Sequence, residues 1–298
     1  MNTGKNKHTP TRRSVMTAAT AAAATALLKV RPAAAAPELD GLSATKGNIN
    51  HSVCLWCYNK MSSSDMAPHA QRLGLKAIDL LTPQQFAPLK EHGLICSMTS
   101  GVNGGIPDGF NRKENHEKIN DSLKKLCDAN AENGYPNVIC FSGNRKGMDD
   151  AEGMKNCAEG IKKVIGYFEQ KKVTLQMELL NSKVNHKDYM CDKSAWGIEL
   201  VKMVGSERFL LLYDIYHMQI DEGDVIATIQ KSHQYFGHYH TGGVPGRNEI
   251  DDTQELNYPA IMRAIVKTGF KGYVAQEFIP KNKDMIASLA QAVKICDV

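Results

Sequence analysis

Residues 209–219, FLLLYDIYHMQ, decide the fold of this chain. A run of apolar residues ends in Asp214, and His217 follows three residues later. A strand of a parallel sheet is buried on both faces, so its sequence is a nearly continuous apolar run. A carboxylate and an imidazole are costly at the end of such a run unless they are paired or bind a ligand. The stretch therefore predicts a buried parallel strand with functional side chains at its carboxyl end.

Three other segments share this arrangement of an apolar run followed by a polar side chain. They are residues 173–181 (VTLQMELLN) with Glu178, residues 235–243 (YFGHYHTGG) with His238 and His240, and residues 272–280 (GYVAQEFIP) with Glu277. Each segment ends in a side chain that binds hard or borderline metal ions. The four segments together predict one site built from the ends of four strands.

Short apolar runs alternate with helical patterns along most of the chain. The predicted strands are residues 51–57, 75–81, 94–99, 137–142, 173–179, 209–214, 235–240 and 272–278, and the clearest predicted helices are residues 111–133, 151–171, 193–204 and 258–268. Eight strand–helix units in about 250 residues are typical of a (β/α)₈ TIM barrel, an α/β fold. A doubly wound sheet is the alternative, but no G-x-G-x-x-G follows the first predicted strand.

The first 36 residues predict an export signal rather than part of the fold. Arg12 and Arg13 precede an alanine-rich stretch of about 11 apolar residues, too short to span a bilayer, and residues 34–36 offer a cleavage site. Paired arginines before a mildly apolar run resemble a twin-arginine signal, although Val15-Met16 replaces the usual Phe-Leu. An ordinary secretory signal or a tail is the alternative. We therefore expect residues 1–36 to direct export to the periplasm, residues 37–48 to be a linker and residues 49–298 to be the barrel, with no stable membrane anchor after cleavage.

Composition narrows the classes of partner. The formal net charge of the chain is +4, and six basic residues lie within the first 31, so the remainder is near neutral. Nucleic-acid binding, which needs a clustered basic face, is not expected. Eight cysteines permit disulfides after export, but their spacing is irregular. For Cys54-Leu-Trp-Cys57 we expect buried structural thiols rather than a redox or zinc motif.

Four of these strand-end residues form the predicted metal site: Glu178, Asp214, His240 and Glu277. They come from four successive strands, whose carboxyl ends meet at one rim of a barrel. Three carboxylates and one imidazole form a mostly oxygen ligand set that suits Mg²⁺ or Mn²⁺. Without a cation the three carboxylates would repel one another and some would stay protonated. The predicted cofactor is therefore a divalent metal ion.

These motifs resemble the xylose-isomerase-like barrel superfamily, and specifically its hydroxypyruvate isomerase branch. The matching segments are QMELLN at Glu178, DIYH ending in His217, HTGGVPGRN from His240, ELNYP from Glu255, and QE at Glu277. The resemblance implies metal ligation by Glu178, Asp214, His240 and Glu277, proton transfer by Glu178 and Glu277, and substrate contacts by His217 and Arg247. Relatives often hold glutamine where this chain has His240, whereas the related ketose 3-epimerases hold histidine.

The resemblance implies a metal-dependent isomerase that interconverts a small α-hydroxy carbonyl compound of the aldose–ketose type. The cation polarises the carbonyl, one glutamate removes the adjacent proton to give an enediolate, and the other glutamate returns a proton. A sugar 3-epimerase, or a dehydratase of keto-sugars or keto-inositols, remains open on the same site. A zinc endonuclease and a non-catalytic sugar-binding barrel are disfavoured. The expected partner is a small sugar or hydroxy-keto acid, and a homo-oligomer is compatible with the sequence.

Several other residues lie near the predicted rim, and for some of them the sequence leaves two interpretations open. Trp56 either lines the pocket or packs against its neighbours, and Asp79 is a candidate for orienting a substrate hydroxyl. Residues 101–109 form either a lid or a connector. Arg145 either meets an acidic substrate or faces solvent. His238 lies two residues before His240 on the same face of its strand, so we expect it deeper in the barrel.

Overall fold

A computed structural model of the protein describes residues 45–58 and 60–298. The predicted export signal and most of the predicted linker lie outside these residues. Among the described helices, none combines the length and the apolar character needed to cross a membrane.

All eight predicted strands are present, and all pair in parallel. They are β1 (Asn50–Cys54), β2 (Ala77–Asp79), β3 (Ile95–Cys96), β4 (Asn137–Cys140), β5 (Thr174–Glu178), β6 (Phe209–Asp214), β7 (Phe236–Thr241) and β8 (Tyr273–Gln276). Their order in the sheet is β3-β2-β1-β8-β7-β6-β5-β4. Strands that follow one another in the chain are therefore neighbours, and β1 pairs with β8, as in a TIM barrel.

The last gap of the ring, between β3 and β4, is bridged by a single residue beyond β3. Thr99 donates its backbone N–H to Asn137 O at 2.9 Å, and its carbonyl accepts from Ile139 N at 3.0 Å. These bonds form an isolated parallel bridge between Thr99 and Val138. The sheet is thus curled, with a full ladder along most of its circumference and a narrow contact at this position. The predicted barrel fold is confirmed, and the doubly wound alternative is wrong.

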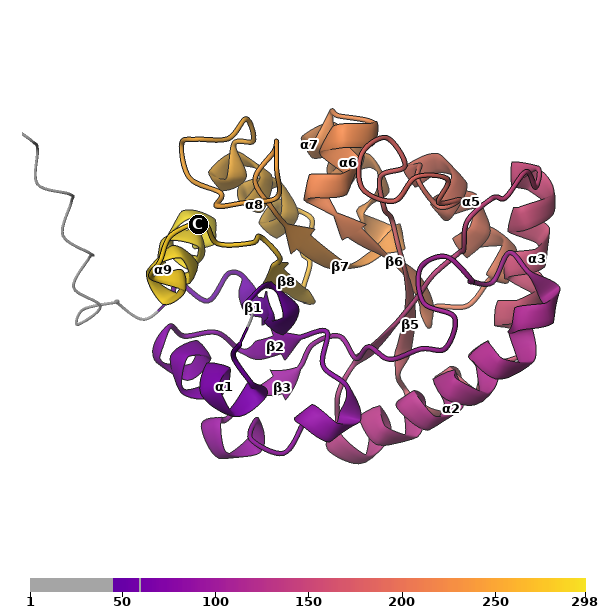
Figure 1. Cartoon of the computed structure of the whole chain (residues 1–298), viewed down its shortest axis with the longest axis horizontal. Helices are drawn as coiled ribbons and strands as arrows, with labels where there is room; N and C mark the ends of the chain where they lie inside the picture. Colours follow the sequence, from indigo (N-terminus) through magenta and orange to yellow (C-terminus); the bar gives the residue numbers. More distant parts are fainter. Residues whose placement is uncertain (1–44, 59) are drawn as a thin grey trace, which may run out of the picture. The chain divides into compact units, whose positions relative to one another are not determined.

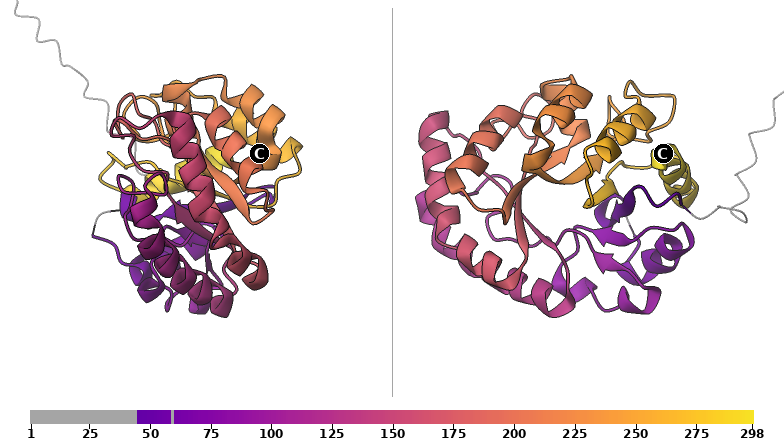
Figure 2. Two further views of the ribbon diagram at one scale, coloured as in Figure 1. Left: turned by 90° about the vertical axis from the view of Figure 1, so that its right-hand side faces the viewer. Right: turned by 180° about the vertical axis from the view of Figure 1, so that it is seen from behind.

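The helices lie outside the ring of strands (Figures 1 and 2). They are α1 (Ser63–Arg72), α2 (His116–Asn133), α3 (Asp150–Lys162), α4 (Ile165–Lys171), α5 (Ser194–Val204), α6 (Ile215–Asp221), α7 (Val225–Ser232), α8 (Tyr258–Lys267) and α9 (Met285–Cys296). Short 3₁₀ turns lie at η1 (Leu55–Cys57), η2 (Pro83–Gln85), η3 (Lys90–His92), η4 (Lys113–Asn115) and η5 (His233–Tyr235). Two 3₁₀ turns replace an α-helix between β2 and β3.

One predicted helix, residues 151–171, is divided in two. α3 ends at Lys162 and α4 begins at Ile165. Gly160 and Gly166 flank the break, and a glycine inside a helix costs about 0.5–1 kcal/mol relative to alanine. The apolar stripe continues across the break, since Ile161, Ile165 and Phe168 are all buried in the same cluster. The hydrophobic pattern therefore predicted the packing face but not the interruption.

The strands carry apolar side chains outward, toward the helices, and a mixed set inward. Val53 and Ile78 belong to an apolar cluster with residues of α1 and α9. Inside the ring, Ser52 Oγ lies 2.7 Å from Ser97 Oγ, and Ser97 Oγ donates to Asp79 Oδ2 at 2.6 Å. The interior is therefore partly polar below the rim, and this polar layer supports the residues at the carboxyl ends of the strands.

Candidate active site

The four predicted metal ligands meet at one point of the rim. Glu178 ends β5, Asp214 ends β6, His240 lies near the end of β7, and Glu277 follows β8 directly. The register of the sheet brings Asp214 opposite His240. One ligand atom from each residue lies within 4.8 Å of the others. His240 Nδ1 is 2.7 Å from Glu277 Oε2 and 3.4 Å from Glu178 Oε1.

This ligand set fits a hard divalent cation. It offers three carboxylates and one imidazole, and all four residues are buried. The donor atoms lie within 4.8 Å of one another, so small side-chain shifts bring them around one ion with metal–oxygen bonds of about 2.0–2.2 Å. His240 Nδ1 faces the carboxylates but makes no hydrogen bond of good geometry. A buried ring nitrogen without a hydrogen bond is accounted for if His240 and the carboxylates would bind the same cation.

Burial and neighbouring charges move the pKa values of the three carboxyl groups apart. Burial raises the pKa of Asp214 to about 8, although Arg247 opposes the shift. Burial also raises the pKa of Glu178, against the opposing effect of the neighbouring His240 ring. Burial acts on Glu277 in the same direction, but the charges of Arg247 and His240 outweigh it and hold the Glu277 pKa well below its usual range. Such divergence within one buried cluster is typical of functional sites.

Arg247 reaches the same point from the loop after β7. Its Nη2 lies 3.1 Å from Asp214 Oδ2 and 2.5 Å from Glu277 Oε2. Its guanidinium also stacks on two aromatic rings, 5.2 Å from the centre of Trp56 and 5.3 Å from that of Tyr216. The backbone of Arg247 has φ +58°, a left-handed conformation that costs about 1–2 kcal/mol for a residue other than glycine. The loop is therefore shaped to hold this side chain over the carboxylates.

His217 lies beside Asp214 but behind the surface of the pocket. Its backbone N–H donates to Asp214 Oδ1 at 3.1 Å, so Asp214 also caps the first turn of α6. Its Nε2 is 3.6 Å from Asp214 Oδ2. Burial lowers the pKa of the His217 ring well below its ordinary value. The ring of His186, with its centre 5.2 Å away, lies next to it and lines the cavity.

A cavity of about 440 Å³ opens above the four predicted ligands. Five of its lining residues are charged or carry a ring N–H: Glu178, Glu277, Arg247, His186 and Trp56. The apolar lining is Leu80, Val102, Ile106, Ile139, Phe141 and Leu180. Trp56 Nε1 donates to Glu277 Oε1 at 2.8 Å, so Trp56 lines the pocket and also orients a predicted catalytic carboxylate.

Asp79 does not reach the cavity, so its expected role with a substrate hydroxyl is wrong. It is fully buried below the rim, where His240 Nε2 lies 3.2 Å from Asp79 Oδ1 and His238 Nε2 lies 2.9 Å from Asp79 Oδ2. Carboxylates that hold the second nitrogen of a ligating histidine fix its tautomer and orientation. Asp79 therefore positions His240, and His238 lies deeper in the barrel, as expected.

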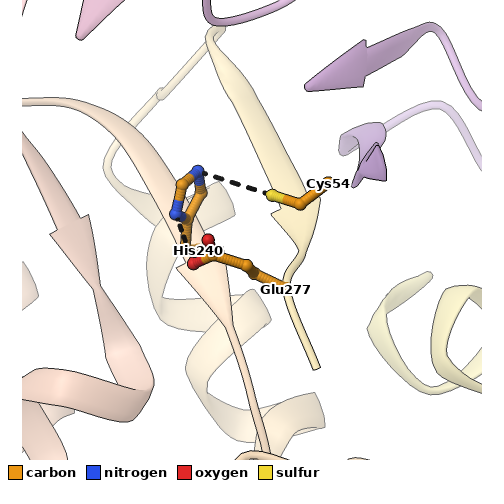
Figure 3. Close-up of side chains that lie close together, drawn as sticks. All are labelled: Cys54, His240 and Glu277. Atoms are coloured by element: carbon orange, nitrogen blue, oxygen red, sulfur yellow. Dashed lines mark hydrogen bonds and ion pairs between the residues drawn. The ribbon is translucent and has the colours of Figure 1, made fainter. Parts of the chain in front are cut away.

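The thiol of Cys54 approaches His240 from the same side as Asp79. Figure 3 shows the His240 ring between the Glu277 carboxylate and the Cys54 sulfur, with Cys54 Sγ 3.8 Å from Nε2. Burial raises the pKa of the Cys54 thiol well above its ordinary value. All eight cysteines are buried and free. The expectation of structural thiols agrees with this arrangement.

Two loops differ in their relation to the cavity. Residues 101–109 supply Gly101, Val102, Gly105 and Ile106 to its wall, so this segment is more than a connector. Arg145 pairs instead with Asp150 and Asp192 and does not line the cavity. An acidic substrate in this cavity therefore meets Arg247 and not Arg145. His186 lines the cavity although no sequence motif predicted it, because its position depends on tertiary contacts.

A family model described as "Xylose isomerase-like TIM barrel" matches residues 69–295. The chain belongs to this family. The resemblance inferred from the strand-end motifs is thus confirmed at the level of the superfamily. The matched region contains all four predicted metal ligands, together with His217 and Arg247.

Members of the family named as hydroxypyruvate isomerases are among the similar proteins. The human protein is 28% identical over 41% of this chain and 44% of its own length, and the mouse protein is 24% identical over 82% of this chain and 86% of its own. A 2-oxo-tetronate isomerase of Haemophilus influenzae is 23% identical over 76% of this chain and 91% of its length.

Solved structures of the family share the fold. A protein from Brucella melitensis titled as an AP endonuclease of family 2 gives a TM-score of 0.73 at 23% identity, over 82% of this chain and 97% of its own. A 3-keto-D-glucoside 4-epimerase from E. coli gives a TM-score of 0.71 at 14% identity, over 83% of this chain and all of its own. At these identities the similarity shows the barrel and not the reaction.

Proposed function

We propose that this protein is a metal-dependent isomerase of the hydroxypyruvate isomerase type, acting on a small α-hydroxy carbonyl compound. The observation that carries the proposal is the convergence of Glu178, Asp214, His240 and Glu277 under a cavity that Glu178, Glu277 and Arg247 also line. The names of the human, mouse and Haemophilus influenzae relatives support the same reaction class.

The two glutamates are placed to exchange protons with a bound substrate. Both Glu178 and Glu277 line the cavity, and they approach it from β5 and β8, on either side of the intervening strands β6 and β7. One carboxylate removes the proton next to the carbonyl, and the other returns a proton to the former carbonyl carbon, while the proton of the substrate hydroxyl passes to the former carbonyl oxygen. A bound divalent cation would polarise the carbonyl and make the adjacent C–H more acidic.

Arg247 favours a substrate that carries negative charge or develops it. Its guanidinium lies at the cavity wall, stacked between two aromatic rings, and it keeps its charge at any physiological pH. The enediolate that forms after proton removal is an anion, and a fixed cation beside it lowers the barrier. A carboxylate on the substrate would be held by the same group.

The test is exchange of substrate hydrogen with solvent. Protein loaded with Mn²⁺ or Mg²⁺ is incubated in D₂O with hydroxypyruvate and with a 2-oxo-tetronate, and products are analysed by NMR and mass spectrometry. We expect deuterium at the carbon next to the carbonyl, and an isomer of unchanged carbon skeleton. Glu277→Gln should abolish exchange, and Glu199→Gln, at an exposed side chain of α5, is the matched control. No exchange into any α-hydroxy carbonyl compound would refute the proposal.

A sugar 3-epimerase is the second candidate. The resemblance to the ketose 3-epimerases implies a histidine ligand at position 240, and a cavity of about 440 Å³ exceeds what a three-carbon acid fills. The same incubation distinguishes the candidates, because an epimerase inverts C3 of a ketose without moving its carbonyl. A keto-sugar or keto-inositol dehydratase would instead give a product lighter by one water.

Export to the periplasm is proposed from residues 1–36 alone. A fusion of these residues to a reporter that functions only after folded export should be exported in a strain with the twin-arginine pathway. Substituting lysine for both Arg12 and Arg13 should retain the reporter in the cytoplasm. Export of the substituted fusion would contradict the twin-arginine assignment.

A further inference from the structure

The side-chain amide of Asn181 has a defined orientation. Asn181 lies in the loop after β5 and is fully buried. Its Oδ1 accepts from Val184 N at 3.0 Å and from Asn185 N at 2.9 Å. Its Nδ2 lies 2.8 Å from Asn185 Oδ1. Turning the amide over would place an NH₂ group against two backbone N–H donors, so the backbone decides which atom is nitrogen.

The second hydrogen of this amide determines the tautomer of His217. Asn181 Nδ2 lies 2.6 Å from His217 Nδ1. An amide NH₂ only donates, so His217 Nδ1 must accept and cannot carry a proton. The single ring proton of His217 then lies on Nε2, and the ring is neutral.

The Nε2–H that results has no partner among the residues that the structure describes. His217 Nε2 is buried without a hydrogen bond, and the carboxylate oxygen of Asp214 is 3.6 Å away. That distance is too long for a hydrogen bond. A buried donor left unpaired is destabilising. The ring is held at Nδ1 by Asn181 and keeps an unpaired donor at Nε2, which indicates that an acceptor oxygen binds there, beside Asp214.

The geometry points to Asn181 as a positioning residue that holds His217 as an N–H donor, through Nε2, to a substrate or water oxygen next to Asp214. In this role His217 does not act as a general base, because its second nitrogen is already engaged by Asn181. The assignment of the His217 tautomer does not depend on which reaction the protein catalyses. Its effect on turnover rests on the proposed isomerase function.

The tautomer is measured by NMR of protein labelled with ¹⁵N-histidine. The ring nitrogens of His217 are identified by their absence in His217→Gln. We expect a protonated, pyrrole-type Nε2 and an unprotonated, pyridine-type Nδ1 in the unsubstituted protein. A protonated Nδ1 there would overturn the proposal, and this measurement needs no Asn181 variant to fold.

Asn181→Asp is the informative substitution. The carboxylate can still accept from the N–H groups of Val184 and Asn185, which preserves the loop, but it cannot donate to His217. We expect Nδ1 of His217 to become protonated in this variant. An Nδ1 that stays unprotonated would refute the role of Asn181. Asn185→Asp is the matched control, because it adds the same charge in the same loop and should leave His217 with its proton on Nε2.

The catalytic consequence is measured separately. Asn181→Asp should lower kcat by about 10²-fold, the effect of losing one donor to a developing oxyanion, with a smaller change in KM. A changed tautomer with unchanged turnover would refute the role of the donor in catalysis. If the unsubstituted protein shows no isomerase activity while its NMR spectrum gives the expected tautomer, the proposed function fails and the assignment of Asn181 stands.

Discussion

The substitution Asp79→Asn tests a residue that supports His240 without contacting a substrate, because Asp79 lies outside the cavity. The substitution keeps the shape of the side chain and removes its charge. In the native structure the two carboxylate oxygens face Ser97 Oγ at 2.6 Å, His238 Nε2 at 2.9 Å and His240 Nε2 at 3.2 Å. An amide offers one oxygen to these three groups, so its NH₂ must face a nitrogen or hydroxyl that formerly donated to a carboxylate.

Two magnitudes follow from this geometry. Leaving one buried imidazole without its acceptor and losing a charge-assisted bond should destabilise the fold by about 3 kcal/mol. For a barrel of this size that corresponds to a fall in melting temperature of roughly 6–12 °C. Losing the group that orients a metal-binding histidine typically weakens metal affinity about 10–100-fold.

The assays are thermal unfolding and calorimetric titration of the metal-free protein with Mn²⁺. Ser52→Ala is the matched control: Ser52 Oγ lies 2.7 Å from Ser97 Oγ, in the same polar layer, but it does not contact Asp79. The control should lose about 1 kcal/mol of stability and keep its metal affinity. If Asp79→Asn binds Mn²⁺ as tightly as the unsubstituted protein, then Asp79 does not position His240 for a metal.

Three further predictions concern charge, packing and pH. Arg247→Met should strengthen Mn²⁺ binding by about tenfold, because it removes a positive charge that lies beside the metal-binding carboxylates. The same substitution should lower kcat/KM. Weaker Mn²⁺ binding in calorimetry would contradict this prediction. Gly166→Ala should raise the free energy of unfolding by about 0.5–1 kcal/mol, because nothing lies within 4 Å of the added carbon. Gly109→Ala should lower the free energy of unfolding by about 3 kcal/mol, because the added carbon would lie 2.3 Å from Phe141 O. Equal denaturation midpoints for the two variants would refute the packing argument. Burial lowers the pKa of His51 from 6.5, so below that pH the unfolded chain binds a proton that the folded protein does not. The melting temperature should therefore fall as the pH is lowered from about 7.5 to about 5.5. In His51→Gln this fall should be smaller.

The strand pattern was predictable because each strand is buried on both faces. The run from Phe209 to Tyr213 is apolar, and Asp214 both ends β6 and caps α6. One residue therefore marks the end of a strand and the start of a helix, and the sequence shows both. Loop paths lack such a pattern. The bridge made by Thr99 and the break between α3 and α4 depend on local geometry that periodicity does not describe.

The convergence of the four predicted ligands could be inferred from fold alone, since successive parallel strands deliver their ends to one rim. The residues behind them could not. Asp79, Asn181 and His186 gain their roles from which atom they face, and a shift of one residue in a loop would change the partner. Asp79 ends a strand as Glu178 does, yet it is fully buried because Ser97, His238 and His240 surround its carboxylate.

Two kinds of contact, stacking and hydrogen bonding, explain why residue 247 is an arginine. Its planar face stacks on Trp56 and Tyr216, while its Nη2 reaches the carboxylates of Asp214 and Glu277. Lysine could supply the charge but not the stacking surface or the forked donors. Because the two aromatic contacts do not depend on the carboxylates, the guanidinium stays at the cavity wall even when those carboxylates find another partner. A fixed cation that remains beside the reacting atoms is what an anionic intermediate requires.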